Sequence, residues 1–242
     1  LEAVLTGVDI SSYGQDLPGK PTLGQMVRRL LTLTPDLQRL RLSSLDPAVV
    51  DEELIDLISS EPRLMPHLHL SVQAGSDLIL KRMKRRHNRQ DVISICARIR
   101  KIRPNIVFGA DLIAGFPTET EALFRETLEL VDDAGLTYLH IFPYSPRPET
   151  PAANMPQVEP NTRKNRAATL RKKGEEIKAS YFQTLKGQTA KILVERKNQG
   201  YTETYAPVSL TNHNQQGTIV SALITNSSAR NLTAKILATP LQ

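Results

Sequence analysis

Five short β-rich segments, separated by helical patterns, constrain the fold of this chain most strongly. The segments cover residues 2–7, 37–44, 67–73, 106–115 and 138–146. Helical periodicity fills the intervals between them, and two helices follow the third segment. Strands that alternate with helices pair in parallel through right-handed crossovers. The sequence therefore predicts an α/β fold, and both a doubly wound sheet and a partial (β/α) barrel fit the pattern.

A change of pattern near residue 146 indicates further parts of the chain. A proline-rich connector precedes a basic helical stretch at 161–185, and short strand patterns with Asn and Gly turns begin near Gly187. Short strands of this kind are typical of a small β-barrel. We expect three parts: residues 1–155 as the barrel-like domain, 156–186 as a basic connector and helix, and 187–242 as an all-β domain.

Composition narrows the class of protein. The chain of 242 residues has a formal net charge of +6 and a pI near 9.5, which weakly favours an anionic partner. Its one cysteine, Cys96, excludes an internal disulfide and a cysteine-built metal site, and its helical spacing with Val92 and Ile99 predicts a buried side chain. We see no membrane-spanning apolar run and no signal peptide, and expect a cytoplasmic protein. Because Leu1 already lies in a strand pattern, we expect the chain to be part of a longer protein.

The alternation of side chains within the strands predicts a polar interior. Successive side chains of a strand point to opposite faces. In the third segment Leu68, Leu70 and Val72 share the apolar face, and the second and fifth segments alternate in the same way. The side chains on the opposite face are Arg39, Arg41, Ser43, His67, His69, Ser71, Gln73, Tyr138, His140, Phe142 and Tyr144. Burying cations and imidazoles without partners costs several kcal/mol each, so we expect this face to line a wet, ligand-holding cavity.

Polar residues also gather where the strands end, at the edge where parallel α/β folds build their sites. These residues are Asp9, Ser43, Ser44, Ser71, Gln73, Asp111, Tyr144 and Ser145. Gly115 follows the fourth strand, and the backbone amides of its turn are expected to face a ligand. Arg147 lies between two prolines that fix its backbone, which predicts a cation at the rim of the same cavity.

Several motifs, taken in chain order, resemble the radical S-adenosylmethionine methylthiotransferases. They are "LTGVDISSYG", "RLRLSSLDP", "HLHLSVQAGSDLILKRMKRRH", "GADLIAGFPTETE" and "YSPRPETPAA". The pattern is most similar to the branch that methylthiolates C2 of N6-threonylcarbamoyladenosine at tRNA position 37, and it spans about residues 1–185. The tail resembles the RNA-binding TRAM domain. The resemblance implies a partial (β/α) barrel of the radical SAM type followed by a small all-β TRAM-like barrel.

The resemblance also implies roles for individual residues. The residues expected to bind S-adenosylmethionine are Gly7, Asp9, Ser43, Ser71, Gln73, Asp111, Gly115, Tyr144 and Ser145. Arg41, His69 and Arg147 are expected to line the substrate side. The basic run "KRMKRRH" (81–87) leaves the third strand on a helix and, with the basic helix at 163–178, is expected to follow the phosphates of the tRNA anticodon arm. Its cations of interest are Lys81, Lys84, Arg85 and Arg86.

The sequence departs from the family pattern at informative positions. Val8–Asp9 replaces the Gln–Asn usual in the isopentenyladenosine branch, and Ala74 replaces a common serine. Both differences favour the threonylcarbamoyl branch, whereas Glu149 replaces a usual glycine. The family holds two [4Fe–4S] clusters through cysteines that are absent here, and thiolates are the ligands of such clusters. We therefore expect no cluster, no catalytic residue and no protein-bound metal in this chain, which alone should be inactive.

Two other interpretations of the residues stay open. His67, His69, His140 and Asp111 could form the site of a metal-dependent hydrolase. The basic helices and the β-rich tail could instead make a non-catalytic RNA-binding module.

Overall fold

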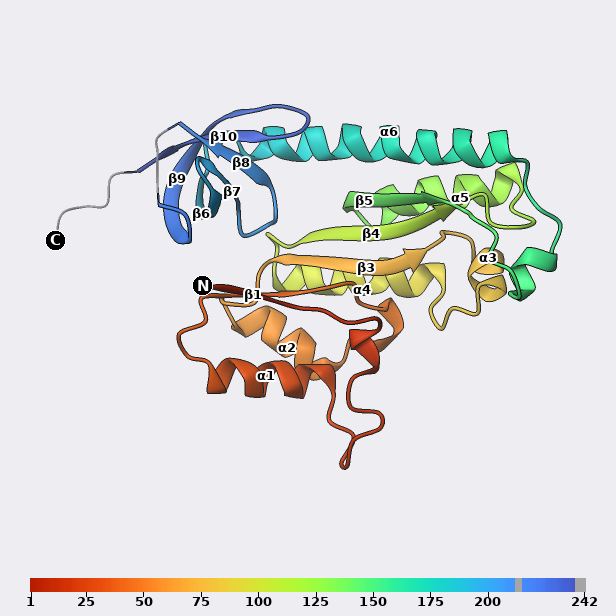
Figure 1. Cartoon of the computed structure of the whole chain (residues 1–242), viewed down its shortest axis with the longest axis horizontal. Coiled ribbons are helices and arrows are strands. Elements are labelled where there is room, and N and C mark those ends of the chain that lie inside the picture. Colours follow the sequence, from red (N-terminus) through yellow and green to blue (C-terminus); the bar gives the residue numbers. More distant parts are fainter. Residues whose placement is uncertain (212–214, 238–242) are drawn as a thin grey trace.

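Five parallel strands in chain order form the centre of the molecule (Figure 1). The computed structural model describes residues 1–211 and 215–237. The strands are β1 (Glu2–Leu5), β2 (Arg39–Leu42), β3 (His67–Gln73), β4 (Val107–Ala114) and β5 (Leu136–Pro143). β1 pairs with β2, β3 to β5 form a second parallel sheet, and isolated bridges connect the two. The arrangement is a partial (β/α) barrel, so the expected α/β fold class is confirmed and the doubly wound sheet is excluded.

Helices pack their apolar stripes against the outer face of the strands. The longer helices are α1 (Leu23–Leu33), α2 (Glu52–Ser60), α4 (Arg89–Ile102), α5 (Glu121–Asp133) and α6 (Pro160–Leu185). Short elements are α3 (Asp77–Arg82) and the turns Ile10–Ser12, Pro47–Val49 and Pro151–Asn154. Leu54, Cys96 and Leu130 are buried in one core with Leu68 and Phe108. Cys96 is fully buried, which confirms the predicted burial of its side chain, and burial raises the pKa of its thiol to about 12.

The helix boundaries follow the local sequence. Thr22 begins α1 and Asn88 begins α4 with a capping box, in which the side chain and the backbone of the cap exchange hydrogen bonds with the third helical residue. In α4 the partners are Asn88 and Asp91, and both hydrogen bonds are present. Gly135 follows α5 at a φ of +61°, the left-handed conformation that ends many helices.

The basic run at 81–87 differs from the expected helix. α3 ends at Arg82, and Lys84 adopts a φ of +58°, so the rest of the run forms a turn that leads into α4. His87 is buried within this turn and contacts the carbonyl oxygen of Val72 through Nε2 at 3.0 Å. Leu80 is buried, and Met83 packs against the same apolar cluster.

The basic helix α6 lies along β5 and β4, and three of its arginines bond to other parts of the chain. Arg163 donates to the carbonyl oxygen of Tyr144 at 3.0 Å, and Arg171 donates to that of Ile141 at 3.1 Å. Arg166 is buried and pairs with Glu119 at 2.9 Å. These cations have structural partners, so the expectation that this helix as a whole follows RNA phosphates is not supported for Arg163, Arg166 and Arg171.

The tail forms a closed five-stranded barrel, as the sequence predicts. Its strands are β6 (Thr189–Arg196), β7 (Gln199–Tyr201), β8 (Pro207–Leu210), β9 (Thr218–Ser227) and β10 (Leu232–Ile236). Phe182 of α6, Val194 and Val208 are buried in the core of this barrel. Residues 212–214 and 238–242 of the expected all-β domain lie outside the described residues.

Two arginines of β2 attach this C-terminal barrel to the amino-terminal end of the strands. Arg39 Nη2 donates to the carbonyl oxygen of Lys191 at 2.8 Å. Arg41 donates to the carbonyl oxygens of Thr202 and Glu203, both at 2.9 Å. Arg41 Nε also donates to Glu2 at 2.9 Å, and its guanidinium lies 4.9 Å from the centre of the Tyr205 ring. Both arginines are buried, and these partners offset the cost of burying their charge.

We predict that Arg41→Met destabilises the protein by about 2–4 kcal/mol, because it leaves buried carbonyls and Glu2 without their donor. Urea unfolding measures the free energy, and hydrogen exchange should show faster exchange at residues 201–206. Arg98→Met, which removes an exposed ion pair with Glu52, is the matched control. It should leave the free energy of unfolding and the exchange rates at residues 201–206 unchanged. Equal effects of the two substitutions would contradict the role of Arg41 as an attachment.

Candidate functional site at the carboxyl ends of the strands

A polar cavity of about 570 Å³ opens at the carboxyl ends of β1 to β4. The residues with assigned roles that line it are Gly7, Asp9, Ser43, Ser71, Lys84, Arg85, Arg86 and Asp111. Several distant segments therefore meet here, as the strand-end argument predicts. Ser44 and Asp46 line the same wall.

A second hollow of about 540 Å³ adjoins the first, because Asp111 lines both. It contains the other expected residues at and after the ends of β3 and β5, which are Gln73, Tyr144, Ser145 and Arg147. Ile113 and Phe142 give it an apolar wall, and Phe142 is half exposed. One hollow is thus polar and basic and the other is largely apolar, a combination that suits an amphipathic ligand.

The conformation of Gln73 is unusual. Its φ is +71°, a left-handed value that residues other than glycine rarely adopt. The pairing of β3 with β4 also shifts between Leu70 and Gln73. Such irregularities re-aim a side chain next to a site, and here the irregularity turns Gln73 into the second hollow.

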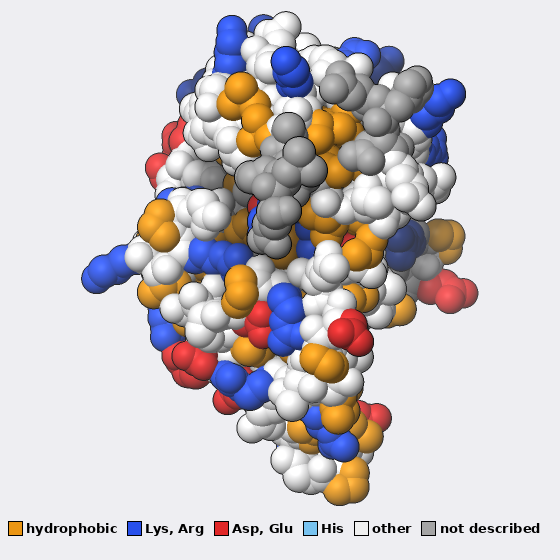
Figure 2. All heavy atoms as spheres, turned by 90° about the vertical axis from the view of Figure 1, so that its left-hand side faces the viewer, with side chains coloured by type: hydrophobic (Ala, Val, Ile, Leu, Met, Phe, Trp, Pro, Cys, Tyr) orange, Lys and Arg blue, Asp and Glu red, His pale blue; other side chains and the backbone are white. Residues whose placement is uncertain are grey.

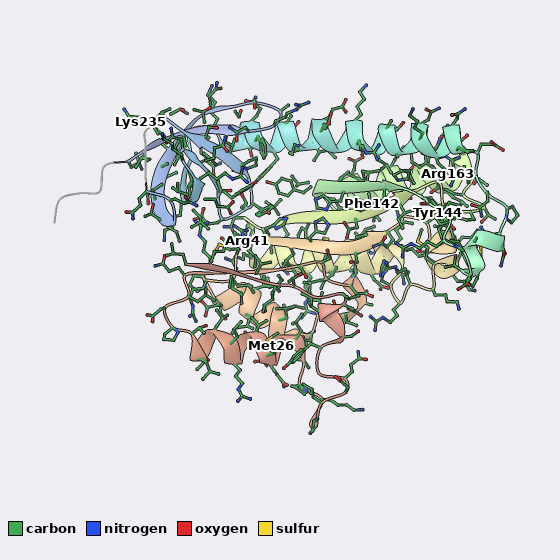
Figure 3. The ribbon with its side chains drawn as sticks, in the orientation of Figure 1. Met26, Arg41, Phe142, Tyr144, Arg163 and Lys235 are labelled. Atoms are coloured by element: carbon green, nitrogen blue, oxygen red, sulfur yellow. The ribbon has the colours of Figure 1, made fainter. Side chains whose placement is uncertain are left out.

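Arg41 lies at the opposite end of the strands from this site. Figure 3 shows it next to the C-terminal barrel, whereas Tyr144 and Arg163 lie at the other end of the molecule. The expectation that Arg41 lines a cavity together with Ser71 is therefore wrong. Alternation fixes the face to which a side chain points, but not its direction along the strand, and the guanidinium of Arg41 extends towards Glu2 and the carbonyl oxygens of the C-terminal barrel.

Gly115 also does not face the cavity. A Cβ atom at this position would lie 2.3 Å from Cγ of Arg163, so the glycine allows close packing of α6. Its amide donates to Glu119 at 2.8 Å, and the amide of Thr118 donates to Pro156 at 3.0 Å. The expected turn amides are thus satisfied inside the protein. Lys81 is exposed on α3, and the lining of the two hollows does not include it.

Three strands bring His69, Asp111 and His140 together beside the two hollows. His69 Nε2 lies 3.0 Å and His140 Nδ1 lies 3.4 Å from the same oxygen, Oδ1 of Asp111. Burial opposes ionisation of Asp111, but hydrogen bonds from His140 and His69 hold its pKa well below the usual range. The carboxylate is therefore ionised at neutral pH. His69 stays in this cluster rather than in the lining of either hollow.

His67 is separate from this cluster, although it shares a face of β3 with His69. Its ring stacks on Tyr205 of the C-terminal barrel at 5.3 Å and meets the edge of Tyr138 at 5.4 Å. Burial, and then the charge of Arg41, lower the pKa of His67 to about 3, so the ring is neutral. The four-residue metal site of the hydrolase interpretation is therefore not formed, because His67 belongs to the contact with the barrel.

Asp46 is a residue of the site that the sequence analysis did not single out. It lines the polar cavity, accepts from the Ala48 amide at 2.9 Å, and pairs with Arg86 at 3.2 Å and His87 at 3.4 Å. Burial raises its pKa, but these partners outweigh burial and hold the pKa well below the usual range. Asp46 belongs to the motif "RLRLSSLDP", but the alternation of side chains indicates the orientation only of residues within strands.

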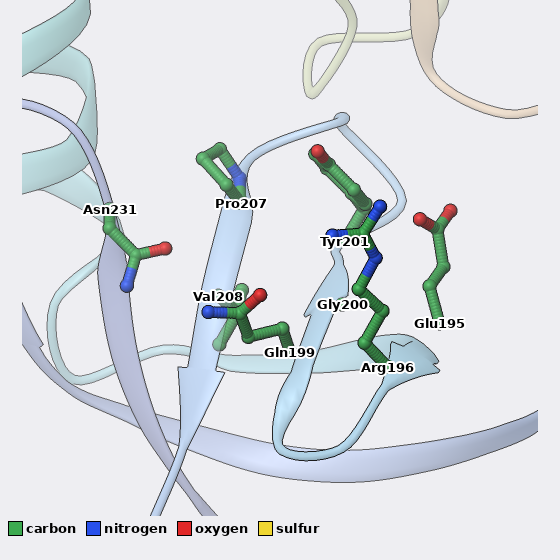
Figure 4. A pocket seen from close by; sticks show the side chains of 8 residues that line it. All are labelled: Glu195, Arg196, Gln199, Gly200, Tyr201, Pro207, Val208 and Asn231. Carbon is green, nitrogen blue, oxygen red and sulfur yellow. The ribbon is translucent and has the colours of Figure 1, made fainter. Parts of the chain in front are cut away.

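The C-terminal barrel carries a separate pocket of about 310 Å³ (Figure 4). Arg196, Tyr201 and Asn231 are among the residues around it, and Tyr201 stacks on Tyr205 at 4.9 Å. Figure 2 shows the end of the molecule formed by this barrel, where Lys and Arg side chains are spread around the rim among apolar and uncharged groups. On this face the positive charge is distributed rather than gathered in one patch.

Comparisons with known proteins agree with this fold. A model of the radical SAM superfamily matches residues 6–131, about half of the chain. A solved structure, the coproporphyrinogen III oxidase HemN of Escherichia coli, described as a radical SAM enzyme, covers 66% of the chain and 38% of its own length, with a TM-score of 0.53 and 18% identity. The chain belongs to the radical SAM superfamily.

Curated relatives identify which members of the superfamily this chain is similar to. The threonylcarbamoyladenosine tRNA methylthiotransferase MtaB of Rickettsia prowazekii is 52% identical over 91% of this chain and 52% of its own length. The tRNA-2-methylthio-N(6)-dimethylallyladenosine synthase of Rickettsia typhi is 35% identical over 98% of this chain and 55% of its own length. The resemblance to tRNA methylthiotransferases is thereby confirmed. The chain spans about half the length of the curated relatives it matches.

Membership of the radical SAM superfamily implies two bound groups, S-adenosylmethionine and an iron–sulfur cluster. The residues of this chain fit the first but not the second. The joined hollows offer hydroxyls, a carboxylate and an apolar wall, which fit S-adenosylmethionine. An iron–sulfur cluster requires thiolates, and Cys96 is the one cysteine and is buried. The residues of this chain therefore do not fit a cluster. Within the described residues, none of the helices has the length and apolarity to cross a membrane.

We predict that Asp46→Asn lowers the free energy of unfolding by about 1–2 kcal/mol at pH 7, a range discounted for the exposure of Arg86. Because the native pKa of Asp46 is depressed, its stabilisation is complete above the usual Asp pKa of about 4 and is lost as the pH falls through the lower native value. The difference between variant and parent should therefore shrink towards pH 2. Denaturant unfolding from pH 7 to pH 2 measures it, and the exposed Asp36→Asn serves as control. A difference that is constant with pH would contradict this account.

Proposed function

We propose that this chain forms the S-adenosylmethionine-binding part and the RNA-binding end of a tRNA methylthiotransferase. The proposed reaction places a methylthio group on C2 of N6-threonylcarbamoyladenosine at position 37 of tRNA, in the cytoplasm. The observation that carries the proposal is the convergence, on two adjoining hollows, of all the residues assigned to the cofactor except Gly115. The similarity to the MtaB relative supports the threonylcarbamoyl branch.

The residues of this chain would bind and orient the cofactor. In this superfamily, S-adenosylmethionine and an iron–sulfur cluster together supply radical chemistry. The ionised Asp111 would accept hydrogen bonds from ribose hydroxyls or from an ammonium group, and Ser43 and Ser71 offer hydroxyls on the same wall. Phe142 would contact the adenine ring in the apolar hollow and exclude water from it.

The chain alone is proposed to bind its ligands without reacting. Cluster ligands would have to come from other residues than these, because Cys96 is buried with a raised pKa. We further propose the division into residues 1–155, 156–186 and 187–242, in which the last part binds RNA. Arg147 at the rim of the apolar hollow remains the proposed contact to the substrate nucleotide.

Binding of the tRNA anticodon arm is proposed to use the mouth of the polar cavity. Lys84, Arg85 and Arg86 line that cavity and can reach phosphates there. Arg86 also pairs with Asp46, so Lys84 and Arg85 are the better candidates for phosphate contacts. A non-catalytic RNA-binding module would bind tRNA equally well, and binding of S-adenosylmethionine distinguishes the two.

We predict that the purified chain binds S-adenosylmethionine and that Ser71→Val weakens this binding about tenfold or more. The substitution removes a hydroxyl and adds a methyl group to the cavity wall. Isothermal titration calorimetry measures the affinity, and Ser94→Val, on the exposed side of α4, is the control. Absent binding in the parent chain, or equal affinity in Ser71→Val, would contradict the site.

We predict that tRNA binding weakens steeply with salt and that Lys84→Gln and Arg85→Gln each reduce the slope of log K against log[salt] by about 1. Fluorescence anisotropy across a salt series measures it, with an unrelated RNA hairpin as competitor. Lys101→Gln, exposed on α4, is the matched control. Unchanged slopes, or no preference for tRNA over the hairpin, would contradict the proposed interface.

A further inference from the structure

We propose that His69, Asp111 and His140 form a binding site for one divalent transition-metal ion of the zinc class. The three residues come from the neighbouring strands β3, β4 and β5, where the pairing register places Asp111 directly beside His140. One donor atom of each lies within 4.8 Å of the others. Two imidazoles and one carboxylate are a ligand set that zinc and cobalt accept. The inference does not rest on the proposed function, because nothing in the assigned reaction requires this ion.

The distances fit such an ion with small adjustments. Metal–nitrogen and metal–oxygen bonds of about 2.0–2.2 Å place neighbouring donors of a tetrahedral shell about 3.4 Å apart. His69 Nε2 lies 3.0 Å and His140 Nδ1 lies 3.4 Å from Oδ1 of Asp111. The imidazole rings of His69 and His140 are 4.4 Å apart, so both nitrogens approach the carboxylate from the same region.

The surroundings hold two of the three ligands in place. His69 is buried, and a Cβ atom at position 109 would lie 2.4 Å from its Nδ1, so Gly109 makes room for this ring. Asp111 has Ser44 Oγ at 3.5 Å from its second oxygen. Contacts of this kind orient ligands and raise metal affinity.

The third ligand leaves the site open. The side chain of His140 is 63% exposed, and Asp111 lines both hollows, so an ion has a path from solvent. Three protein ligands would leave a coordination position for water or for a carboxylate oxygen of a molecule in the hollow. The alternative is that two histidines simply share hydrogen bonds with Asp111, and that arrangement requires no ion.

Metal binding by the chelator-treated, tag-free chain tests the proposal. Isothermal titration calorimetry with zinc should show one ion per chain, and cobalt should give the visible absorption of a tetrahedral site. His140→Gln and Asp111→Asn should each weaken zinc binding by about tenfold or more. Because His140 is exposed, His140→Gln should unfold at the same temperature as the parent in the absence of metal.

His67→Phe is the matched control. It replaces a histidine on the same strand face with a ring that can keep the stacking on Tyr205, and zinc affinity should remain that of the parent. No zinc or cobalt binding by the parent chain would overturn the proposal. Equal zinc affinity in His140→Gln, or loss of zinc in His67→Phe alone, would place the ion elsewhere and would also overturn it. Titration of S-adenosylmethionine into the metal-free chain separates this result from the proposed function.

Discussion

The structure depends on one physical constraint: the parallel strands bury polar and charged side chains on one face, and these side chains require hydrogen-bonding or ionic partners. Alternation along β2 and β3 places leucines against the helices and arginines, histidines and serines on the opposite face. A buried guanidinium or imidazole without partners costs several kcal/mol. The molecule meets this requirement in different ways along the strands. Carbonyl groups of the C-terminal barrel accept from Arg39 and Arg41, Asp111 accepts from His69, and the serines face an open cavity.

This division explains why one set of strands has both a structural and a functional end. At the amino-terminal end, Tyr205 and Tyr138 enclose His67, and the C-terminal barrel covers the arginines. At the carboxyl end, the strands finish in loops, and the polar side chains stay accessible. The cluster of Asp111 lies between these two regions. A single β-strand such as His67–Gln73 thus contributes to the contact with the barrel, to the cluster and to both hollows.

Two local patterns of the sequence predicted much of the architecture. Strands that alternate with helices indicated the fold, and alternating side chains within the strands indicated which residues share the interior face. Ser71 and Gln73 could be placed on the interior face from alternation. Their positions, and that of Asp111, near the strand ends predicted that the three residues would lie at the carboxyl end. Arg41 could not be placed correctly, because its acceptors at Thr202 and Glu203 lie more than 160 residues away. The predicted role of Gly115 was wrong for a similar reason. The glycine is required by close packing against Arg163, a residue that is distant in the sequence. Asp46 was missed because loops carry no periodicity.

The central claim is that this chain supplies the cofactor-binding and RNA-binding parts of a threonylcarbamoyladenosine methylthiotransferase. The most direct test joins the chain to the remaining amino-terminal part of the Rickettsia prowazekii MtaB relative, to which it is 52% identical. Mass spectrometry of tRNA nucleosides, from cells that lack their own enzyme, then measures the 2-methylthio derivative of N6-threonylcarbamoyladenosine. The account predicts that this derivative appears with the joined protein and disappears when Ser71 is replaced by valine. A folded joined protein that binds S-adenosylmethionine but leaves the nucleoside unmodified would contradict the claim.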